Sequence, residues 1–195
     1  MEMLKSFNEF INEATIAANP ADTGNLVGIL NKYIGKKEEG RNAGPMVKGF
    51  LSSVGLGVGN PWCMAFVYDI FDEFCKAKGV SNPLPKTGGV LYFWGKVPSE
   101  NKIKPTPLDV RPGQIFIKRR KGGGHTGIVI KVEGDSFISI DGNSSDMVKL
   151  NKYKISDMLG FVDYFKNPKL SDGIAKLAST IISKNTPTLG GGKEV

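Results

Sequence analysis

The sequence predicts an α+β domain, because helical patterns occupy its first half and strand patterns its second half. Up to Gly79, apolar residues recur every three or four positions between capping residues and glycines. From Gln114 onward, short apolar runs are separated by Gly-rich or Gly-Asp turns, which is typical of antiparallel strands. The chain has 195 residues, enough for one domain with a full hydrophobic core and short appendages at its ends.

Several helices are expected before the strand region, each with apolar positions at helical spacing. The first ones cover residues 2–18, residues 22 or 23 to about 33, and residues 44–53. The next helix has the clearest signal. Asn60 is expected to cap it, Pro61 suits its first position, and an apolar stripe that includes Phe66 and Ile70 leads to its end at Gly79.

The remaining sequence divides into an irregular crossing, a strand region and a tail. Residues 81–112 contain six prolines and are expected to be irregular, with an apolar cluster at 90–94 over a core or groove. Strands are expected at residues 115–117, 126–132, 137–141 and 161–165, with a helix at 170–185 before a flexible tail. The expected organisation is a leader or docking helix at 1–20, a domain at 21–168, and a C-terminal helix and tail at 169–195.

The formal charge of +7 and the pI near 9.3 favour anionic partners such as nucleic acid, a membrane surface or the acidic polymers of a bacterial wall. Nucleic acid is disfavoured, because the basic residues are dispersed and no helix-turn-helix, zinc or RNA-binding aromatic motif is present. No apolar run approaches the roughly 20 residues of a membrane span, and the N-terminus does not resemble a signal-peptide core. The basic run at 118–121 is either a solvated hairpin tip or an attraction for wall polymer.

The two cysteines are expected to lie in one helix and to play different roles. Counted from an Asn60 cap, Cys63 occupies the third helical position, where the helix dipole favours the nucleophilic thiolate. The alternative is that Cys63 only packs beside Trp62, since free cysteine is often buried. Cys75 lies deep in the helix and is interpreted as a packing residue, too far along it for a disulfide with Cys63.

The chain contains one histidine, so a Cys-His enzyme built from it must use His125. If strands 125–132 and 137–143 form a hairpin centred on Gly134, His125 lies across from Asn143 and diagonal to Asp141, on the same face. Asp141 and Asn143 could equally form a plain turn. Together, these residues predict a nucleophile, a base and an orienting group. One histidine and two distant cysteines supply no tetrahedral metal site, and no cofactor is expected.

Five stretches, taken together and in order, resemble the CHAP domains, cysteine- and histidine-dependent amidohydrolases and peptidases of the NlpC/P60, papain-like group. They are EEGRNAGP at 38–45, GLGVGNPWCMAF at 55–66, RPGQIFI at 111–117, GGGHTGIVI at 122–130 and ISIDGNSSDMV at 138–148. The resemblance covers residues 28–165 and implies a papain-like fold, with the cysteine at a helix N-terminus that packs on an antiparallel sheet.

The resemblance also implies roles for residues. Cys63 would be the nucleophile, His125 the general base and Asp141 the acidic group that orients the imidazole, with Asn143 as a nearby partner or substitute. Position 114 is Gln where such domains usually have an acidic residue, and position 141 is Asp where Glu is frequent. This second departure leaves the orienting residue open between positions 141 and 143.

An aromatic group near the site has two interpretations, a substrate groove or part of the core. It comprises Trp62, Tyr92, Phe93 and Trp94. The substrate implied by the resemblance is the peptide part of bacterial peptidoglycan, cut either at its junction with the sugar or within the peptide. Rival hypotheses are a module that keeps the fold but only binds virion or wall, and a papain-like acyltransferase or transglutaminase.

The sequence Ile11-Asn12-Glu13-Ala14 resembles the cleavage signal of prohead proteases of T4-like phages. It favours a phage setting, in which a wall hydrolase travels with the virion or waits in the host cytoplasm until lysis. The expected partners are peptidoglycan, anionic wall polymers and, through the termini, phage structural proteins.

Overall fold

The computed structural model describes residues 26–165, so the helices expected at 2–18 and 170–185 lie outside the described residues. The helices are α2 (Leu26–Asn31), α3 (Pro45–Ser53), α4 (Cys63–Ala77), α5 (Val90–Lys96) and the short 3₁₀ turns η2 (Ser99–Asn101) and η3 (Ile155–Asp157). The strands are β1 (Lys102–Ile103), β2 (Ile115–Arg120), β3 (Gly123–Glu133), β4 (Ser136–Asp141), β5 (Lys149–Lys154) and β6 (Gly160–Val162).

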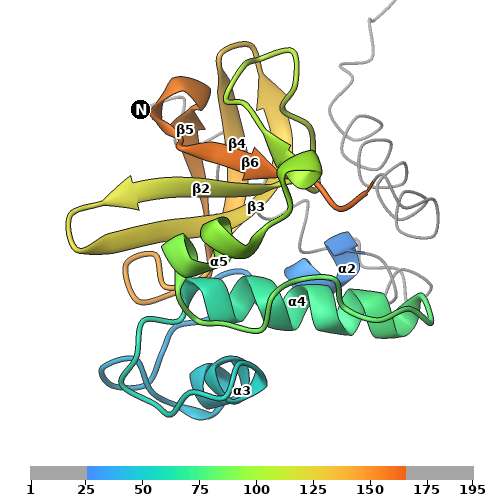
Figure 1. The fold of residues 1–195 in the computed structure, drawn as a ribbon. Helices are drawn as coiled ribbons and strands as arrows, with labels where there is room; N and C mark the ends of the chain where they lie inside the picture. Colours follow the sequence, from blue (N-terminus) through green and yellow to red (C-terminus); the bar gives the residue numbers. More distant parts are fainter. Residues whose placement is uncertain (1–25, 166–195) are drawn as a thin grey trace, which may run out of the picture.

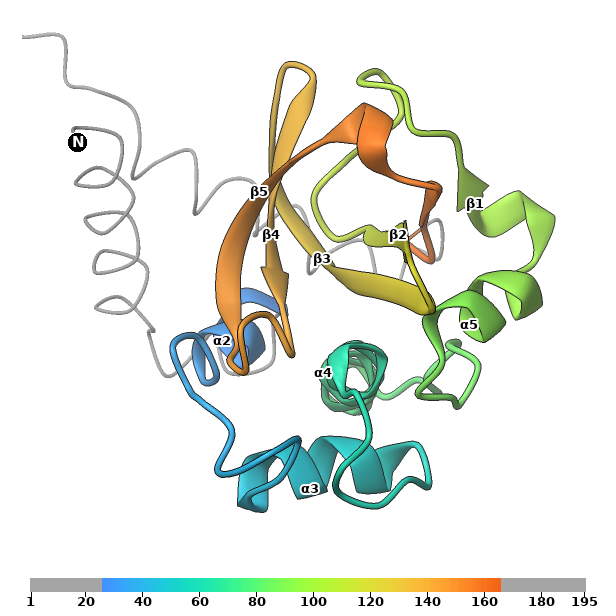
Figure 2. The ribbon, with the colours of Figure 1, turned by 90° about the vertical axis from the view of Figure 1, so that its left-hand side faces the viewer.

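The described strands form one curved antiparallel sheet in the order β1-β6-β2-β3-β4-β5. Helix α4 lies against β3 on one face of this sheet, and α2 and α3 lie against α4 (Figures 1 and 2). The expected α+β architecture, with early helices packed on an antiparallel sheet, is therefore confirmed.

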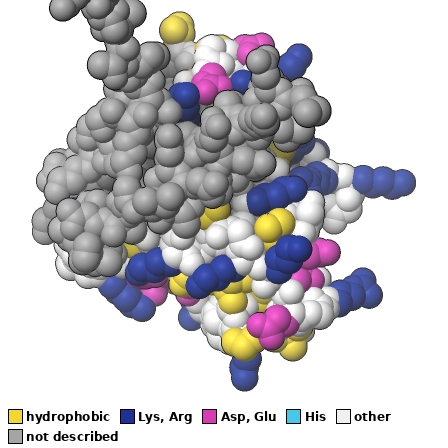
Figure 3. Space-filling view, turned by 180° about the vertical axis from the view of Figure 1, so that it is seen from behind, with side chains coloured by type: hydrophobic (Ala, Val, Ile, Leu, Met, Phe, Trp, Pro, Cys, Tyr) yellow, Lys and Arg dark blue, Asp and Glu magenta, His cyan; other side chains and the backbone are white. Residues whose placement is uncertain are grey.

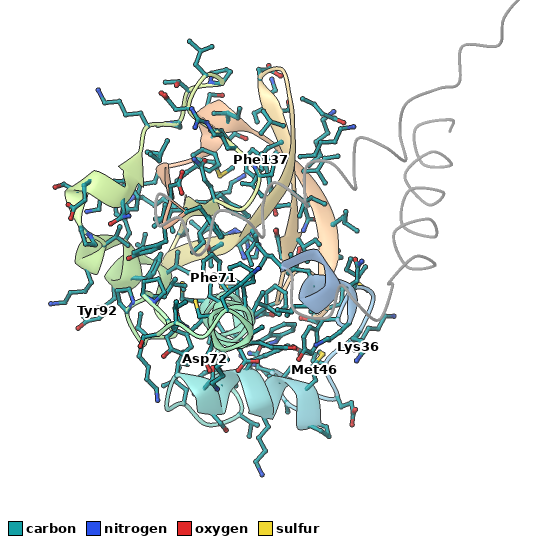
Figure 4. All side chains as sticks on the ribbon, turned by 90° about the vertical axis from the view of Figure 1, so that its right-hand side faces the viewer. Lys36, Met46, Phe71, Asp72, Tyr92 and Phe137 are labelled. Carbon is teal, nitrogen blue, oxygen red and sulfur yellow. The ribbon has the colours of Figure 1, made fainter. Side chains whose placement is uncertain are left out.

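The two faces of the sheet bury separate apolar clusters. Side chains such as Ile128 and Ile140 pack with α4 in the larger cluster, whereas Phe116, Phe137 and Phe161 pack within the curve of the sheet on its other face. Figure 4 shows Phe71 between α4 and the sheet, and Phe137 on the sheet's other side. The alternation of the strand residues between these clusters fixes which side chains share a face with His125.

Helix α4 begins at Cys63, two residues after Pro61, the first helical position expected from the sequence. The Asn60 side chain donates to the carbonyl oxygen of Gly57 (3.0 Å), so it stays in the preceding loop and does not cap the helix. Trp62 is the N-cap, and its carbonyl oxygen accepts the first helical bond, from Phe66 N (2.8 Å). Cys63 is therefore the first helical residue, and the expectation that it occupies the third position is wrong.

The stretch expected to be irregular contains helix α5. Phe93 N donates to Gly89 O (2.8 Å) to close its first turn, and Val90 and Phe93 are its buried residues. Seven residues rich in aromatic and β-branched side chains give a weak helical signal, which explains the error. Packing of the two buried side chains, three positions apart, stabilises the helix in place of intrinsic propensity.

The hairpin of β3 and β4 has the expected register at its open end but not at its turn. A centre at Gly134 predicts that Ile128 pairs with Ile140, and the structure confirms this pair. At the turn, Glu133 pairs with Ser136, a shift of one residue that a bulge in the middle of β3 absorbs. Because of the bulge, the expected register holds at the open end of the hairpin, where His125 and Asp141 lie.

Strand β5 was not expected from the sequence. Its residues KLNKYK alternate, but Leu150 is its only buried residue, so the strand carries almost no hydrophobic signal. It pairs along the whole of β4 and forms an edge of the sheet. This edge contributes two side chains to the site described next.

Candidate active site

His125 and Asp141 meet inside the protein at the open end of the β3–β4 hairpin. His125 Nε2 lies 3.0 Å from Asp141 Oδ2, and the side chains are 2% and 0% exposed. The Phe116 ring packs against the imidazole at 5.8 Å between centroids. This contact and the carboxylate hold the ring in one orientation.

Three other groups donate to the Asp141 carboxylate. Ser139 Oγ donates to Oδ1 (2.6 Å), while Asn151 Nδ2 (2.9 Å) and the Tyr153 hydroxyl (2.8 Å) donate to Oδ2. Gly127 leaves the room for it, since a Cβ there would overlap the carboxylate. Because the carboxylate oxygens act as acceptors, His125 Nε2 carries the shared proton, and Nδ1 is left for proton exchange.

Tyr153 remains a donor in this network. Burial raises the pKa of Tyr153 well above its ordinary value, and the neighbouring charge of Asp141 and their hydrogen bond raise it further. The Arg120 guanidinium also hydrogen-bonds the Tyr153 hydroxyl and acts in the opposite direction on its pKa. The hydroxyl thus links a surface cation to the buried carboxylate.

Cys63 lies at the start of α4 with its sulfur close to β3. Its Sγ accepts hydrogen bonds from the backbone N–H groups of Met64 and Thr126. Thr126 follows His125 in β3. The pairing of β3 with β4 ends at Ile128 and Ile140, so the N–H of Thr126 has no β4 partner and can point at the sulfur. The structure thus brings the cysteine to the part of β3 that carries the histidine.

The electrostatics of Cys63 differ from the expectation for a helix start. The side chain is 5% exposed, and burial raises the pKa of the thiol to about 11. The N–H groups of Met64 and Thr126 and the charge of Arg120 lower it, but they do not offset the burial. The N–H groups at the helix start thus act in the expected direction, but burial outweighs them, and the pKa of the resting thiol lies well above neutral pH.

Asn143 does not share the Asp141 network. It has a left-handed backbone conformation, with φ of 55°, and its Nδ2 lies 3.3 Å from Asn42 Oδ1. It therefore ties the loop after β4 to the loop that contains Asn42. Of the two residues left open by the sequence, the structure places Asp141 against His125.

The aromatic residues occupy different places. Trp62 is 0% exposed and donates from Nε1 to Glu38 Oε2 (2.8 Å). The Trp94 ring lies against Gly160, and the Lys102 ammonium lies 4.8 Å from its centroid. Tyr92 is 60% exposed on α5 (Figure 4). Of the three residues expected to bind substrate, only Tyr92 lines the cleft that contains Cys63, and neither Trp62 nor Trp94 does.

A cleft of about 530 Å³ opens beside Cys63. It is lined by Leu56, residues 60–61, Cys63 and residues 88–92 and 120–124. The sulfur therefore has an open approach from one side despite its low exposure. Such a cleft beside a thiol, with an oriented imidazole on the adjoining strand, can support nucleophilic attack on a carbonyl group.

Sequence reasoning missed Ser139, Asn151, Tyr153 and Glu38 as site residues. Asn151 and Tyr153 lie two positions apart, so they share a strand face, and this spacing was the available signal. Glu38 stands in a stretch that carries the family resemblance, but the sequence alone gave no role for it. Its carboxylate accepts from both Trp62 and the backbone N–H of Asn42 (2.8 Å).

Within residues 26–165, no group of three or more His, Cys, Asp or Glu side chains is arranged to hold a metal ion. None of the helices in that range has the length and apolar character required to cross a bilayer. Figure 3 shows Lys and Arg side chains spread over the visible part of the rear face, with acidic side chains between them.

The family model of the CHAP domain matches residues 55–143. The matched segment contains Cys63, His125, Asp141 and Asn143. No curated protein matches the chain.

Proposed function

We propose that this chain, which carries a CHAP domain and with it amidase or peptidase activity of the peptidoglycan-hydrolase type, cleaves amide bonds of peptidoglycan through Cys63. The domain has the α+β, papain-like fold, with the cysteine at the start of α4 and α4 packed on the antiparallel sheet. In this proposal, His125 is the general base, and Asp141 orients it.

The proposed reaction starts from a neutral thiol, because burial keeps Cys63 protonated. Nδ1 of His125 accepts the thiol proton as Sγ attacks the amide carbonyl, and the carboxylate of Asp141 stabilises the imidazolium through Nε2. Backbone N–H groups at the start of α4, including that of Cys63, steady the oxyanion. The imidazolium then protonates the leaving amine, and a thioester remains on Cys63.

Water completes the cycle. His125 takes a proton from a water molecule in the cleft, and the resulting hydroxide adds to the thioester carbonyl. The carbon–sulfur bond breaks, the thiolate recovers the proton, and a carboxylic acid leaves. The net reaction consumes one water molecule and one amide and forms one amine and one carboxylic acid.

One observation carries the proposal. The Thr126 N–H donates to Cys63 Sγ. The preceding residue, His125, donates from Nε2 to the fully buried carboxylate of Asp141. A packing cysteine does not require an oriented imidazole on the adjoining strand, nor a carboxylate with further donors around it. Nucleophilic catalysis requires both.

Hydrolysis of purified peptidoglycan tests the proposal. New free amino groups should appear without new reducing sugar ends, and the Cys63→Ala and His125→Ala chains should release none. Cys75→Ala is the matched control. Cys75 is also a buried cysteine of α4, at 0% exposure, but it lies far from the start of the helix and from His125. Mass spectrometry of the fragments identifies the bond, either the muramoyl–alanine amide or one within the peptide. Equal hydrolysis by wild type and Cys63→Ala would overturn the proposal.

A phage role, as an endolysin or virion-associated enzyme, is a further part of this proposal. Its support is Ile11-Asn12-Glu13-Ala14, which lies outside the described residues. We expect particle-derived protein to have an N-terminus at Ala14, measured by intact mass. A particle-derived chain that still begins at Met1 would remove the processing hypothesis.

A further inference from the structure

The cleft beside Cys63 has charge of one sign only. Arg120 and Lys121, at the end of β2 and in the turn that follows, are the charged residues of its lining, and both are exposed. The opposite wall comes from residues 88–92 of the α5 region. A substrate that occupies this cleft therefore meets two cations and no carboxylate among the described lining residues.

Arg120 is exposed, and its guanidinium lies beside the network around Asp141. Its guanidinium hydrogen-bonds the Tyr153 hydroxyl, and that hydroxyl donates to the buried Asp141. Its charge is also close enough to Cys63 to act on the thiol. A guanidinium that already has a partner beside the nucleophile loses less conformational entropy when it binds an anion than a side chain without one would.

Glycines on the cleft lining differ in the space beside them. A Cβ at Gly124 would lie 2.8 Å from Val90 Cγ1, and one at Gly88 would lie 2.5 Å from Leu56 Cδ1, so the chain packs closely at these two points. A Cβ at Gly122 or Gly123 would meet no atom within 4 Å, so open space lies beside these two residues of the lining. Tyr92 is exposed on the facing segment.

From this arrangement we propose that the cleft selects a peptide with a free carboxylate near the cleaved amide, and that Arg120 pairs with that carboxylate. Lys121 adds a second positive charge. The guanidinium presents several N–H donors in one plane, and the two oxygens of a carboxylate can accept from two of them. A carboxamide on the substrate has only one oxygen and no charge, so it binds the guanidinium less well. The inference rests on the proposed function and adds the substrate class that the same site prefers.

A pair of synthetic stem peptides tests the preference. The two peptides are identical except that the acidic residue beside the cleaved bond carries a free carboxylate in one and a carboxamide in the other. Binding is measured by calorimetry to the Cys63→Ala chain, so that the result does not depend on turnover. We expect the free acid to bind about tenfold more tightly, the factor typical of one charge-assisted contact in a half-open site.

The matched pair of variants is Arg120→Gln and Arg119→Gln, each made in the Cys63→Ala chain. Both remove one exposed arginine from β2, but Arg119 alternates to the other side of the strand and does not line the cleft. Arg120→Gln should abolish the preference for the acid, and Arg119→Gln should leave it intact. An equal loss in both variants would mean diffuse attraction to anionic polymer and would overturn the inference.

Alkylation of the active chain gives a second readout. Iodoacetate carries a carboxylate and iodoacetamide does not, and both react with the same thiolate, so the ratio of their rates cancels the thiolate fraction. Arg120→Gln should lower the iodoacetate-to-iodoacetamide ratio at Cys63 about tenfold, with Arg119→Gln as the control. An unchanged ratio would show that Arg120 acts only through Tyr153.

The outcomes separate this inference from the proposed function. Equal affinity of the Cys63→Ala chain for the acid and the amide peptide overturns the carboxylate preference, even if the wild-type chain hydrolyses peptidoglycan. Absence of hydrolysis together with a preserved acid preference leaves the carboxylate site standing and removes the enzymatic proposal. Each result therefore assigns the failure to one of the two claims.

Discussion

Substitution of Asp141 by Asn separates orientation of His125 from stabilisation of its charge. The Ser139 hydroxyl can accept as well as donate, so the new amide nitrogen can take the Oδ1 position. The amide oxygen then still faces His125, Asn151 and Tyr153. We therefore expect the variant to fold, with a loss of unfolding free energy of about 1–3 kcal/mol.

The magnitude of the kinetic effect follows from the 3.0 Å contact between Nε2 and Oδ2. Two unit charges at that separation interact by about 5 kcal/mol at an effective dielectric constant of about 20, which sets the upper limit. The difference between a charge-assisted and a neutral hydrogen bond, about 1.5 kcal/mol, sets the lower limit. Asp141→Asn should thus lower kcat by between about 10-fold and about 4,000-fold, since 1.4 kcal/mol corresponds to a factor of ten.

The assay is the initial rate of amine release from peptidoglycan, with thermal unfolding to verify the fold. Asn143→Ala is the comparison, because Asn143 contacts Asn42 and not the imidazole network. We expect it to change kcat by less than about threefold, the effect of one part-buried neutral hydrogen bond outside the imidazole network. A nearly unchanged rate in Asp141→Asn together with a large loss in Asn143→Ala would refute the assignment.

Three further predictions concern stability and positioning. Because burial raises the pKa of Cys63 from 9.0 to about 11, its neutral form contributes stability below pH 9 that is lost as pH rises to 11. Wild type should lose about 2–3 kcal/mol more than Cys63→Ala over that interval in denaturant unfolding, and parallel curves would contradict this. Gly127→Ala should lower Tm by several degrees, because the new Cβ would overlap the Asp141 carboxylate. Gly123→Ala should leave Tm unchanged, because the space around Gly123 is open, and equal Tm values for the two variants would contradict this prediction. Glu38→Gln should lower kcat more than it changes KM, because Gln has one acceptor oxygen and leaves either the Trp62 or the Asn42 donor, close to Cys63, without a partner. A similar effect of Glu39→Gln, at the adjacent position, would contradict this prediction.

The sequence was informative where hydrophobic periodicity and local chemistry agree. Helix α4 and strands β2, β3 and β4 carry continuous apolar patterns, and these elements position Cys63, His125 and Asp141. The pairing of the β3–β4 hairpin at its open end was also predictable, although only because a bulge compensates for the turn.

The remaining features depend on tertiary contacts that leave little trace in sequence. Strand β5 is a polar edge, stabilised by its pairing with β4. The cap of α4 could not be predicted, because Asn60 bonds back to Gly57 instead. The raised pKa of Cys63 results from burial, which helix position alone does not reveal.

In the proposed mechanism, Cys63 and His125 exchange a proton through Nδ1. The chain has one histidine, so the imidazole signals in a ¹⁵N NMR spectrum all come from His125, and their couplings to the two ring C–H protons distinguish Nδ1 from Nε2. We predict that Nε2 carries the proton at rest, that Nδ1 has the shift of an unprotonated nitrogen, and that Cys63→Ala changes the Nδ1 signal while Cys75→Ala does not. A proton on Nδ1 alone, or an Nδ1 signal that is indifferent to the removal of the Cys63 sulfur, would contradict the account.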